Sequence, residues 1–161
     1  MEIDNKQNKK INEEMNYLGI DQNLSDKKIE TTGKILGVDF GTKNIGIAIS
    51  DSGQQQAFVY DTLKMSGMLF EDIKKICLEE AADKIVVGLP LGMSGEYTEK
   101  TNEVIYFVEA LEKVTGLMVV TEDERLTSVQ ANKTGSGHGR DEEAARIILQ
   151  QYLDRRGMNN L

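Results

Sequence analysis

Cysteine, histidine and long hydrophobic runs are all scarce in this sequence, and each scarcity excludes something. Cys77 is the only cysteine among 161 residues, so an internal disulfide is excluded. A cysteine nucleophile would need a base nearby, but the only histidine, His138, lies far away in the sequence. We therefore expect Cys77 to be a small core residue on a helix.

Long apolar segments are also missing. The longest apolar runs, such as residues 84–89, have the length of a strand, whereas a membrane span needs about 20 apolar residues. The N-terminal residues are polar and charged, with no apolar stretch of signal-peptide length. We expect no membrane association and a cytoplasmic location.

Basic residues are fewer than acidic residues, and the formal net charge is -8. This argues against broad, nonspecific nucleic-acid binding, which depends on Lys and Arg contacts to phosphates. It does not exclude a nuclease, because a site that binds metal ions through carboxylates is itself acidic and the ions supply the local positive charge.

The composition, with 39% hydrophobic and 29% charged residues, suits one globular domain. We predict that this domain spans residues 34–157 and that residues 158–161 form a short tail. Residues 1–33 are rich in Asn, Lys, Glu and Asp. They are predicted to be an N-terminal extension, either a partly disordered tail or a short amphipathic helix.

Hydrophobic periodicity predicts five strands and three helices after residue 33. The predicted strands are residues 34–40, 45–50, 56–63, 84–89 and 117–120. The predicted helices are residues 66–82, 99–115 (with Gly116 as a stop signal) and 141–155. This order predicts an α/β domain with a five-stranded mixed sheet, a three-strand antiparallel meander plus two parallel strands, flanked by helices. It is the element order of ribonuclease H-like domains.

Asp39 is the first candidate for a chemical role. It ends an otherwise apolar strand and is followed at once by Phe40, Gly41 and Thr42. An aspartate at such a place is costly unless it is hydrogen-bonded, paired or bound to metal. The alternative is a carboxylate that only caps the turn.

A second acidic cluster follows the last predicted strand. Residues 122–124 read Glu-Asp-Glu and are followed by Arg125. Strand alternation would place Glu122 and Glu124 on one face and Asp123 on the other. The cluster is either part of a site or a solvated turn, and Thr127 or Ser128 could cap a following helix.

The third acidic position is Asp141, at the predicted start of the last helix. Asp141 and Ala145 share a helix face, so packing of that face on the sheet would direct Asp141 toward Asp39. Capping of the helix alone would also explain an acid here.

Separated carboxylates that meet at strand ends suit a hard divalent ion, Mg²⁺ or Mn²⁺. Two such ions could assist phosphodiester hydrolysis. The candidates for phosphate contacts are Lys43, Arg125 and Arg140, although surface salt bridges would explain each of them equally. His138, in a glycine-rich loop, is either a proton shuttle or an exposed loop residue.

The motifs together resemble the YqgF (RuvX) family of pre-16S ribosomal RNA nucleases or Holliday junction resolvase-like proteins. The matching segments are residues 36–51, 85–91, 123–128 and 141–154. The resemblance covers essentially residues 34–156. Residues 92–95, the glycine-rich loop before Asp141 and residues 1–33 depart from the family pattern.

The resemblance implies a ribonuclease H-like fold and a three-carboxylate metal site at Asp39, Glu124 and Asp141, with Asp123 as an alternative to Glu124. Because residues 84–89 contain no acid, the second ligand must come from the next strand. The implied function is a Mg²⁺-dependent endonuclease acting on structured nucleic acid, with the 5′ end of pre-16S rRNA as the leading substrate.

Three alternatives stay open. A Holliday junction resolvase would cut branched DNA and would need two sites in a symmetric homodimer. Asp39 and the turn after it also resemble the first phosphate loop of actin-like ATPases and sugar kinases, but those proteins need a second domain that 161 residues cannot hold. A non-catalytic interaction protein is the third alternative.

Overall fold

The computed structural model describes residues 33–125 and 139–159, and the fold is given for these residues. The predicted extension, apart from residue 33, lies outside them. So do His138, Thr127 and Ser128.

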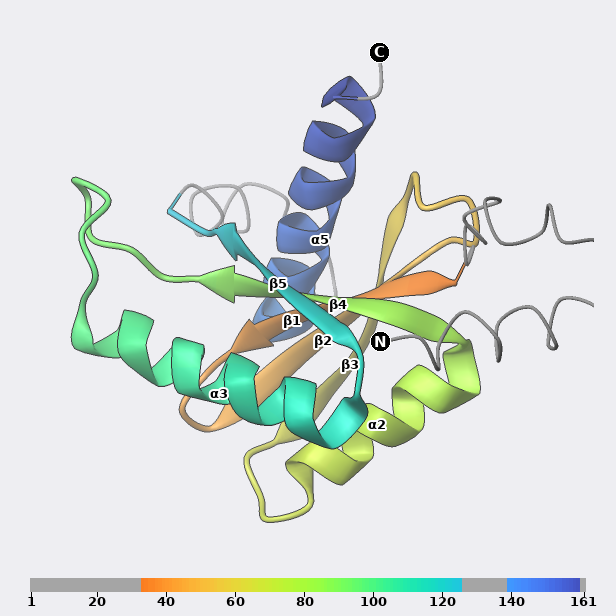
Figure 1. Cartoon of the computed structure of the whole chain (residues 1–161), viewed down its shortest axis with the longest axis horizontal. Coiled ribbons are helices and arrows are strands. Elements are labelled where there is room, and N and C mark those ends of the chain that lie inside the picture. Colours follow the sequence, from red (N-terminus) through yellow and green to blue (C-terminus); the bar gives the residue numbers. More distant parts are fainter. Residues whose placement is uncertain (1–32, 126–138, 160–161) are drawn as a thin grey trace, which may run out of the picture. The chain divides into compact units, whose positions relative to one another are not determined.

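One mixed sheet forms the centre of the domain (Figure 1). Its spatial order is β3-β2-β1-β4-β5. β1 pairs antiparallel with β2, and β2 pairs antiparallel with β3, whereas β4 runs parallel to both β1 and β5. The strands are β1 (Lys34–Phe40), β2 (Asn44–Ser50), β3 (Ala57–Lys64), β4 (Ala82–Leu89) and β5 (Met118–Asp123). The predicted meander with two added parallel strands is confirmed.

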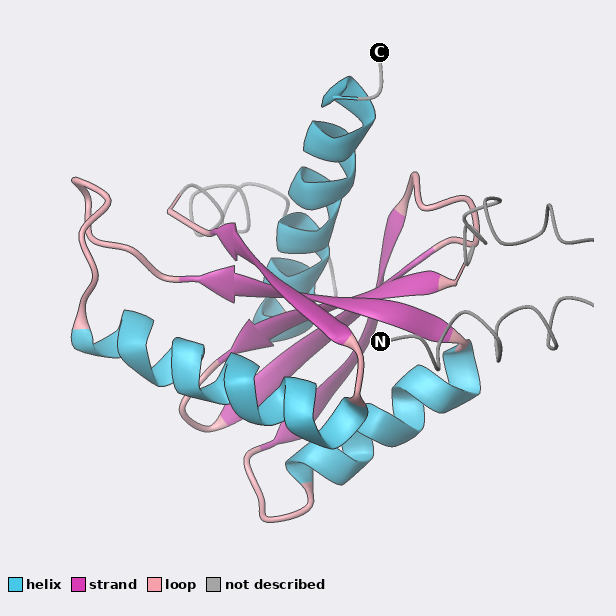
Figure 2. Cartoon of the chain, in the orientation of Figure 1, coloured by secondary structure: helices cyan, strands magenta, loops and turns pink. Residues whose placement is uncertain are grey.

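Helices cover both faces of this sheet (Figure 2). On one face lie α2 (Leu69–Glu80) and α3 (Glu99–Thr115), which also contact each other. On the opposite face α5 (Arg140–Asn159) packs alone across β1, β2 and β3. No helix in the described part of the chain is long and apolar enough to cross a membrane.

Strand alternation produces two separate hydrophobic layers. Leu36 and Val38 of β1 face α2 and α3, and they belong to the larger layer. Ile35 faces α5 and packs with Ala145 and Leu149. Because side chains alternate along a strand, Asp39 shares the α5 face with Ile35.

Several boundaries differ from the predicted ones. β5 continues to Asp123, so two of the clustered acids belong to the strand rather than to the turn after it. α2 begins at Leu69 instead of residue 66 and ends at Glu80 instead of residue 82, because the left-handed backbone of Ala81 closes the helix. α5 continues to Asn159, beyond the predicted end at residue 155. Local periodicity does not show that pairing with β4 extends β5 as far as Asp123.

Cys77 packs inside the larger layer, as expected. Burial raises the pKa of its thiol to about 11. The thiolate that would act as a nucleophile is therefore scarce at neutral pH.

Candidate active site

The acidic positions converge at one edge of the sheet because β1, β4 and β5 are parallel. The carboxyl ends of parallel neighbours lie at the same edge, and the pairing registers confirm this arrangement for all three strands. Asp39 stands next to the last residue of β1 and pairs with Gly46 of β2. Its half-buried side chain accepts no hydrogen bond from a described residue.

Glu124 reaches this edge from β5 although β4 lies between β5 and β1. The space comes from Gly88 of β4. A Cβ atom built on Gly88 would lie 2.5 Å from Glu124 Oε2 and 2.5 Å from Ile148 Cδ1. Because Gly88 has no side chain, Glu124 can extend over β4 on the face covered by α5. Glu124 thus supplies an acid where β4 itself has none.

A second glycine brings Asp141 to the same place. A Cβ on Gly46 would collide with the backbone oxygen of Asp141, so only glycine at this position allows the first turn of α5 to lie against β2. Gly46 is the pairing partner of Asp39. Ala145, one turn after Asp141, is fully buried against the sheet. This face of α5 therefore packs on the sheet, which is the condition for Asp141 to point toward Asp39.

Electrostatic coupling links the three carboxylates. Burial, reinforced by the charge of Asp141, raises the pKa of Asp39 to about 6. Burial, reinforced by the charges of Asp39 and Asp123, raises the pKa of Glu124 to about 7. In both cases Lys100 acts in the opposite direction. The edge therefore holds like charges that repel one another and lack hydrogen-bond donors from the described residues.

Among the described residues, no three His, Cys, Asp or Glu side chains are close enough together to form a ready metal cluster. The donor set nevertheless fits a hard divalent cation, because carboxylate oxygens are its preferred ligands. Half-buried carboxylates with raised pKa values gain most from a cation. Asp39, Glu124 and Asp141 are thus suitable ligands, with Asp39 coupled to each of the other two.

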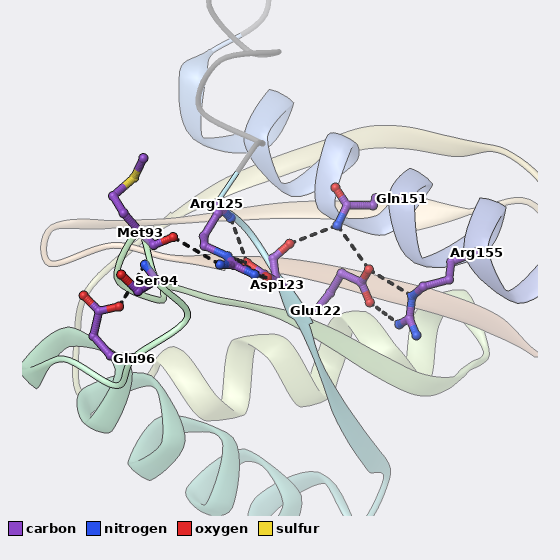
Figure 3. Close-up of polar contacts among 8 residues, drawn as sticks. All are labelled: Met93, Ser94, Glu96, Glu122, Asp123, Arg125, Gln151 and Arg155. Carbon is purple, nitrogen blue, oxygen red and sulfur yellow. Dashed lines mark hydrogen bonds and ion pairs between the residues drawn. The ribbon is translucent and has the colours of Figure 1, made fainter.

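Glu122, the neighbouring acid on the same strand face, has a different environment (Figure 3). It is buried and bonded to two residues of α5. Arg155 Nε donates to Glu122 Oε1 at 3.2 Å, and a second Arg155 nitrogen forms an ion pair with Oε2. Gln151 Nε2 donates to Glu122 Oε1 at 3.1 Å. Glu122 therefore fixes α5 to β5 and is not available for a ligand.

Asp123 points to the other side and pairs with Arg125, at 2.7 Å between Oδ2 and the guanidinium (Figure 3). The Arg125 hydrogen bond holds the pKa of Asp123 below its usual range. Arg125 also donates to the backbone oxygen of Met93 at 3.4 Å. This pair joins the end of β5 to the loop before α3, so the Asp123 carboxylate already has a partner, whereas Glu124 has no ion pair with a described residue.

The predicted phosphate contacts have different surroundings. Lys43 and Arg140 are both exposed and form no ion pair with a described residue. Lys43 lies in the turn after Asp39, and Arg140 begins α5 beside Asp141. Arg125, by contrast, already has Asp123 as its partner.

Lys100 is a residue that sequence reasoning missed. It lies in the first turn of α3, and its charge acts on both Asp39 and Glu124. Nothing in the sequence distinguishes it from the other exposed helix lysines, because only the tertiary fold brings α3 to the edge that holds the carboxylates.

Sequence comparison identifies relatives along most of the chain. Residues 33–155 match the model of the family described as "RuvX: Holliday junction resolvase". A relative from Maridesulfovibrio salexigens is 37% identical over 133 residues, which cover 76% of this chain and 98% of that protein. One from Clostridium kluyveri is 39% identical over 133 residues, covering 76% and 97%. Both are named "Putative pre-16S rRNA nuclease".

Among solved structures, RuvC of Thermus thermophilus in complex with a Holliday junction substrate has a TM-score of 0.56 to this chain at 13% identity. The alignment covers 78% of this chain and 96% of RuvC. At this identity the likeness shows the fold alone, and it confirms the ribonuclease H-like architecture.

Proposed function

This chain belongs to the RuvX family and is a nuclease by that membership, and from this premise we propose that it is a metal-dependent endonuclease with its site at Asp39, Glu124 and Asp141. The observation that carries the proposal is the coupling of Asp39 to the other two carboxylates at one edge of the sheet. These acids have no donor partner among the described residues.

The bound ion would be Mg²⁺ or Mn²⁺, held by the three carboxylates. Such an ion lowers the pKa of bound water and stabilises charge on the leaving oxygen. The chain's own part is to place the ligands. Gly88 gives Glu124 its path over β4, and Gly46 holds the start of α5 against β2.

Basic residues around the carboxylates would hold the nucleic-acid backbone. Lys43, in the turn after β1, and Arg140, next to Asp141, are both exposed. Arg125 contributes differently, by keeping the loop before α3 next to the end of β5. A proton-shuttling role for His138 remains a prediction on a residue outside the described ranges.

We propose the 5′ end of pre-16S rRNA as the substrate and the cytoplasm as the location. The support is the name of the relatives, which this chain covers almost entirely. The acidic balance of the chain suits recognition of a defined structure better than tight, nonspecific binding.

Cleavage of a precursor rRNA transcript tests this function. Wild-type protein should cut it only with Mg²⁺ or Mn²⁺. Asp39→Asn should lower the rate by more than the roughly 100-fold that loss of a second-shell partner can cost. Asp72→Asn, on the exposed surface of α2, is the matched control and should cut normally. Full activity of Asp39→Asn would refute the assignment.

Holliday junction resolution is the second candidate, favoured by the description of the matching family. It would require a homodimer that presents two sites to the junction. Paired cuts in a four-way DNA junction by a dimeric species would support it. Cleavage of rRNA by a monomer that leaves junctions intact would exclude it.

A further inference from the structure

The start of α3 is fixed at the edge of the sheet that carries the site. Thr98 and Thr101 form a reciprocal cap, in which the Thr98 backbone N–H donates to Thr101 Oγ1 at 2.9 Å. The Thr101 hydroxyl also donates to the backbone oxygen of Pro90, which directly follows β4. Thr101 is completely buried. Lys100, between these anchors, therefore has a defined backbone position at the carboxyl end of β4.

The ammonium of Lys100 has no bonded partner among the described residues. Only some of the described lysines have one: Lys34 pairs with Glu80 at 2.8 Å and Lys75 lies 3.8 Å from Glu79, whereas Lys43 has no ion pair with a described residue. Lys100 is exposed and forms no such pair. The bond of the next residue, Thr101, to Pro90 places Lys100 at the end of β4, between the strands that lead to Asp39 and Glu124. A lysine held near two carboxylates without an ion pair to either has its donors available for another anion.

We propose that Lys100 is a substrate-binding residue of this site, whose ammonium contacts a non-bridging oxygen of the phosphodiester held at Asp39 and Glu124. The inference rests on the proposed nuclease function and deepens it. Lysine suits this role because its compact charge can approach a phosphate oxygen from several directions.

The position of Lys100 also implies competition with the metal. Before the ion binds, the ammonium offsets part of the carboxylate charge. With an ion held by Asp39 and Glu124, the ammonium of Lys100 would be left to contact the phosphate. Loss of its charge should therefore strengthen metal binding and weaken nucleic-acid binding. A merely structural role for Lys100 would not produce two effects of opposite sign.

The experiment uses the full chain with Lys100→Met and Lys100→Arg. Lys113→Met is the matched control, because Lys113 is an exposed lysine in the last turn of the same helix. Calorimetry with Mn²⁺ alone measures metal affinity. Fluorescence anisotropy with a labelled RNA from the pre-16S 5′ end, in Ca²⁺, measures nucleic-acid affinity. Cleavage kinetics in Mg²⁺ supply kcat and KM.

For Lys100→Met we expect about fivefold tighter Mn²⁺ binding and about tenfold weaker RNA binding. The slope of log affinity against log salt should shrink by about one. KM should rise about tenfold with kcat changed much less. Lys100→Arg should recover RNA affinity, and Lys113→Met should match wild type in every measurement.

Unchanged RNA affinity and unchanged KM in Lys100→Met would overturn the inference while leaving the proposed function intact, provided that wild type cuts and Asp39→Asn does not. Equal losses in Lys113→Met would also overturn it, since the effect would then reflect net charge. Failure of wild type to bind Mn²⁺ and to cut RNA is a different result, because it removes the proposed function itself.

Discussion

Glu122 and Glu124 lie two residues apart on the same face of the sheet, yet their surroundings are opposite. Glu122 is buried within β5 and accepts hydrogen bonds from Arg155 and Gln151. Glu124 follows the strand, extends over Gly88 and receives no side-chain donor from the described residues. Burial raises its pKa to about 7.

This difference separates an acid that stabilises the fold from one that we propose binds a ligand. Both carboxylates have lost water, and desolvation without a partner is costly. In Glu122 the cost is offset within the fold by donors from α5. For Glu124 and Asp39 no donor in the described residues offsets this desolvation cost, so a bound ligand would offset it. Functional sites often lower the stability of the fold in this way.

The largest expected effect comes from exchanging the two acids in turn for glutamine. Glu124→Gln should lower Mg²⁺-dependent cleavage by about a hundredfold or more and should leave metal-free stability unchanged or higher. Glu122→Gln should keep most activity but lower the free energy of unfolding by about 1–2 kcal/mol, because Arg155 loses its charged partner. Urea unfolding and cleavage kinetics measure both.

The two variants are each other's control, because the substitution is the same and the two positions lie only two residues apart. Loss of stability in Glu124→Gln together with loss of activity in a stable Glu122→Gln would reverse the comparison. The assignment of roles would then be wrong.

The second effect is a pH dependence of stability. The pKa of Asp39 is raised to about 6 and that of Glu124 to about 7, whereas both ionise near pH 4 in an unfolded chain. Between these values the folded protein binds more protons than the unfolded chain. Without divalent ions, stability should therefore fall as pH rises from about 4 to 7, by about 3 kcal/mol or more from these groups, because one pKa unit corresponds to about 1.4 kcal/mol.

The measurement is urea unfolding of wild type and of the double variant Asp39→Asn, Glu124→Gln across this pH range. The difference between the two curves isolates these carboxylates from other titrating groups. Saturating Mg²⁺ should remove the difference at neutral pH, because an ion that binds only the folded state stabilises it. A difference that does not change with pH would contradict the raised pKa values.

The smallest effect concerns Asp123, the third acid of the cluster, through its partner Arg125. Arg125→Ala removes an exposed pair and a bond to the loop before α3, and exposed pairs contribute little. The urea midpoint should change less than in Glu122→Gln. KM should rise about twofold to threefold, because the loop before α3 loses its hydrogen bond from Arg125. A loss as large as that of Glu124→Gln would show that Arg125 itself contacts substrate.

Much of this fold could be predicted because the periodicities are strong. Residues 99–115 were predicted as a helix with Gly116 as its stop, and α3 has these bounds, with a left-handed Gly116. Asp39 stood out because an acid at the end of an apolar strand needs an explanation. The choice between Asp123 and Glu124 could not be made from alternation alone, since it depends on Arg125 and on the space above Gly88.

By itself, the sequence determined the strands, the helices and the three acidic segments, because hydrophobic alternation and turn residues act over short distances. It also carried the family resemblance through the order of its motifs. Only the tertiary structure decided that Glu122 is satisfied and Glu124 is not, and that Lys100 acts on the carboxylates. The reason is physical: burial, charge coupling and the supply of donors depend on segments far apart in the chain, and their meeting is set by the pairing of strands and the packing of α3 and α5.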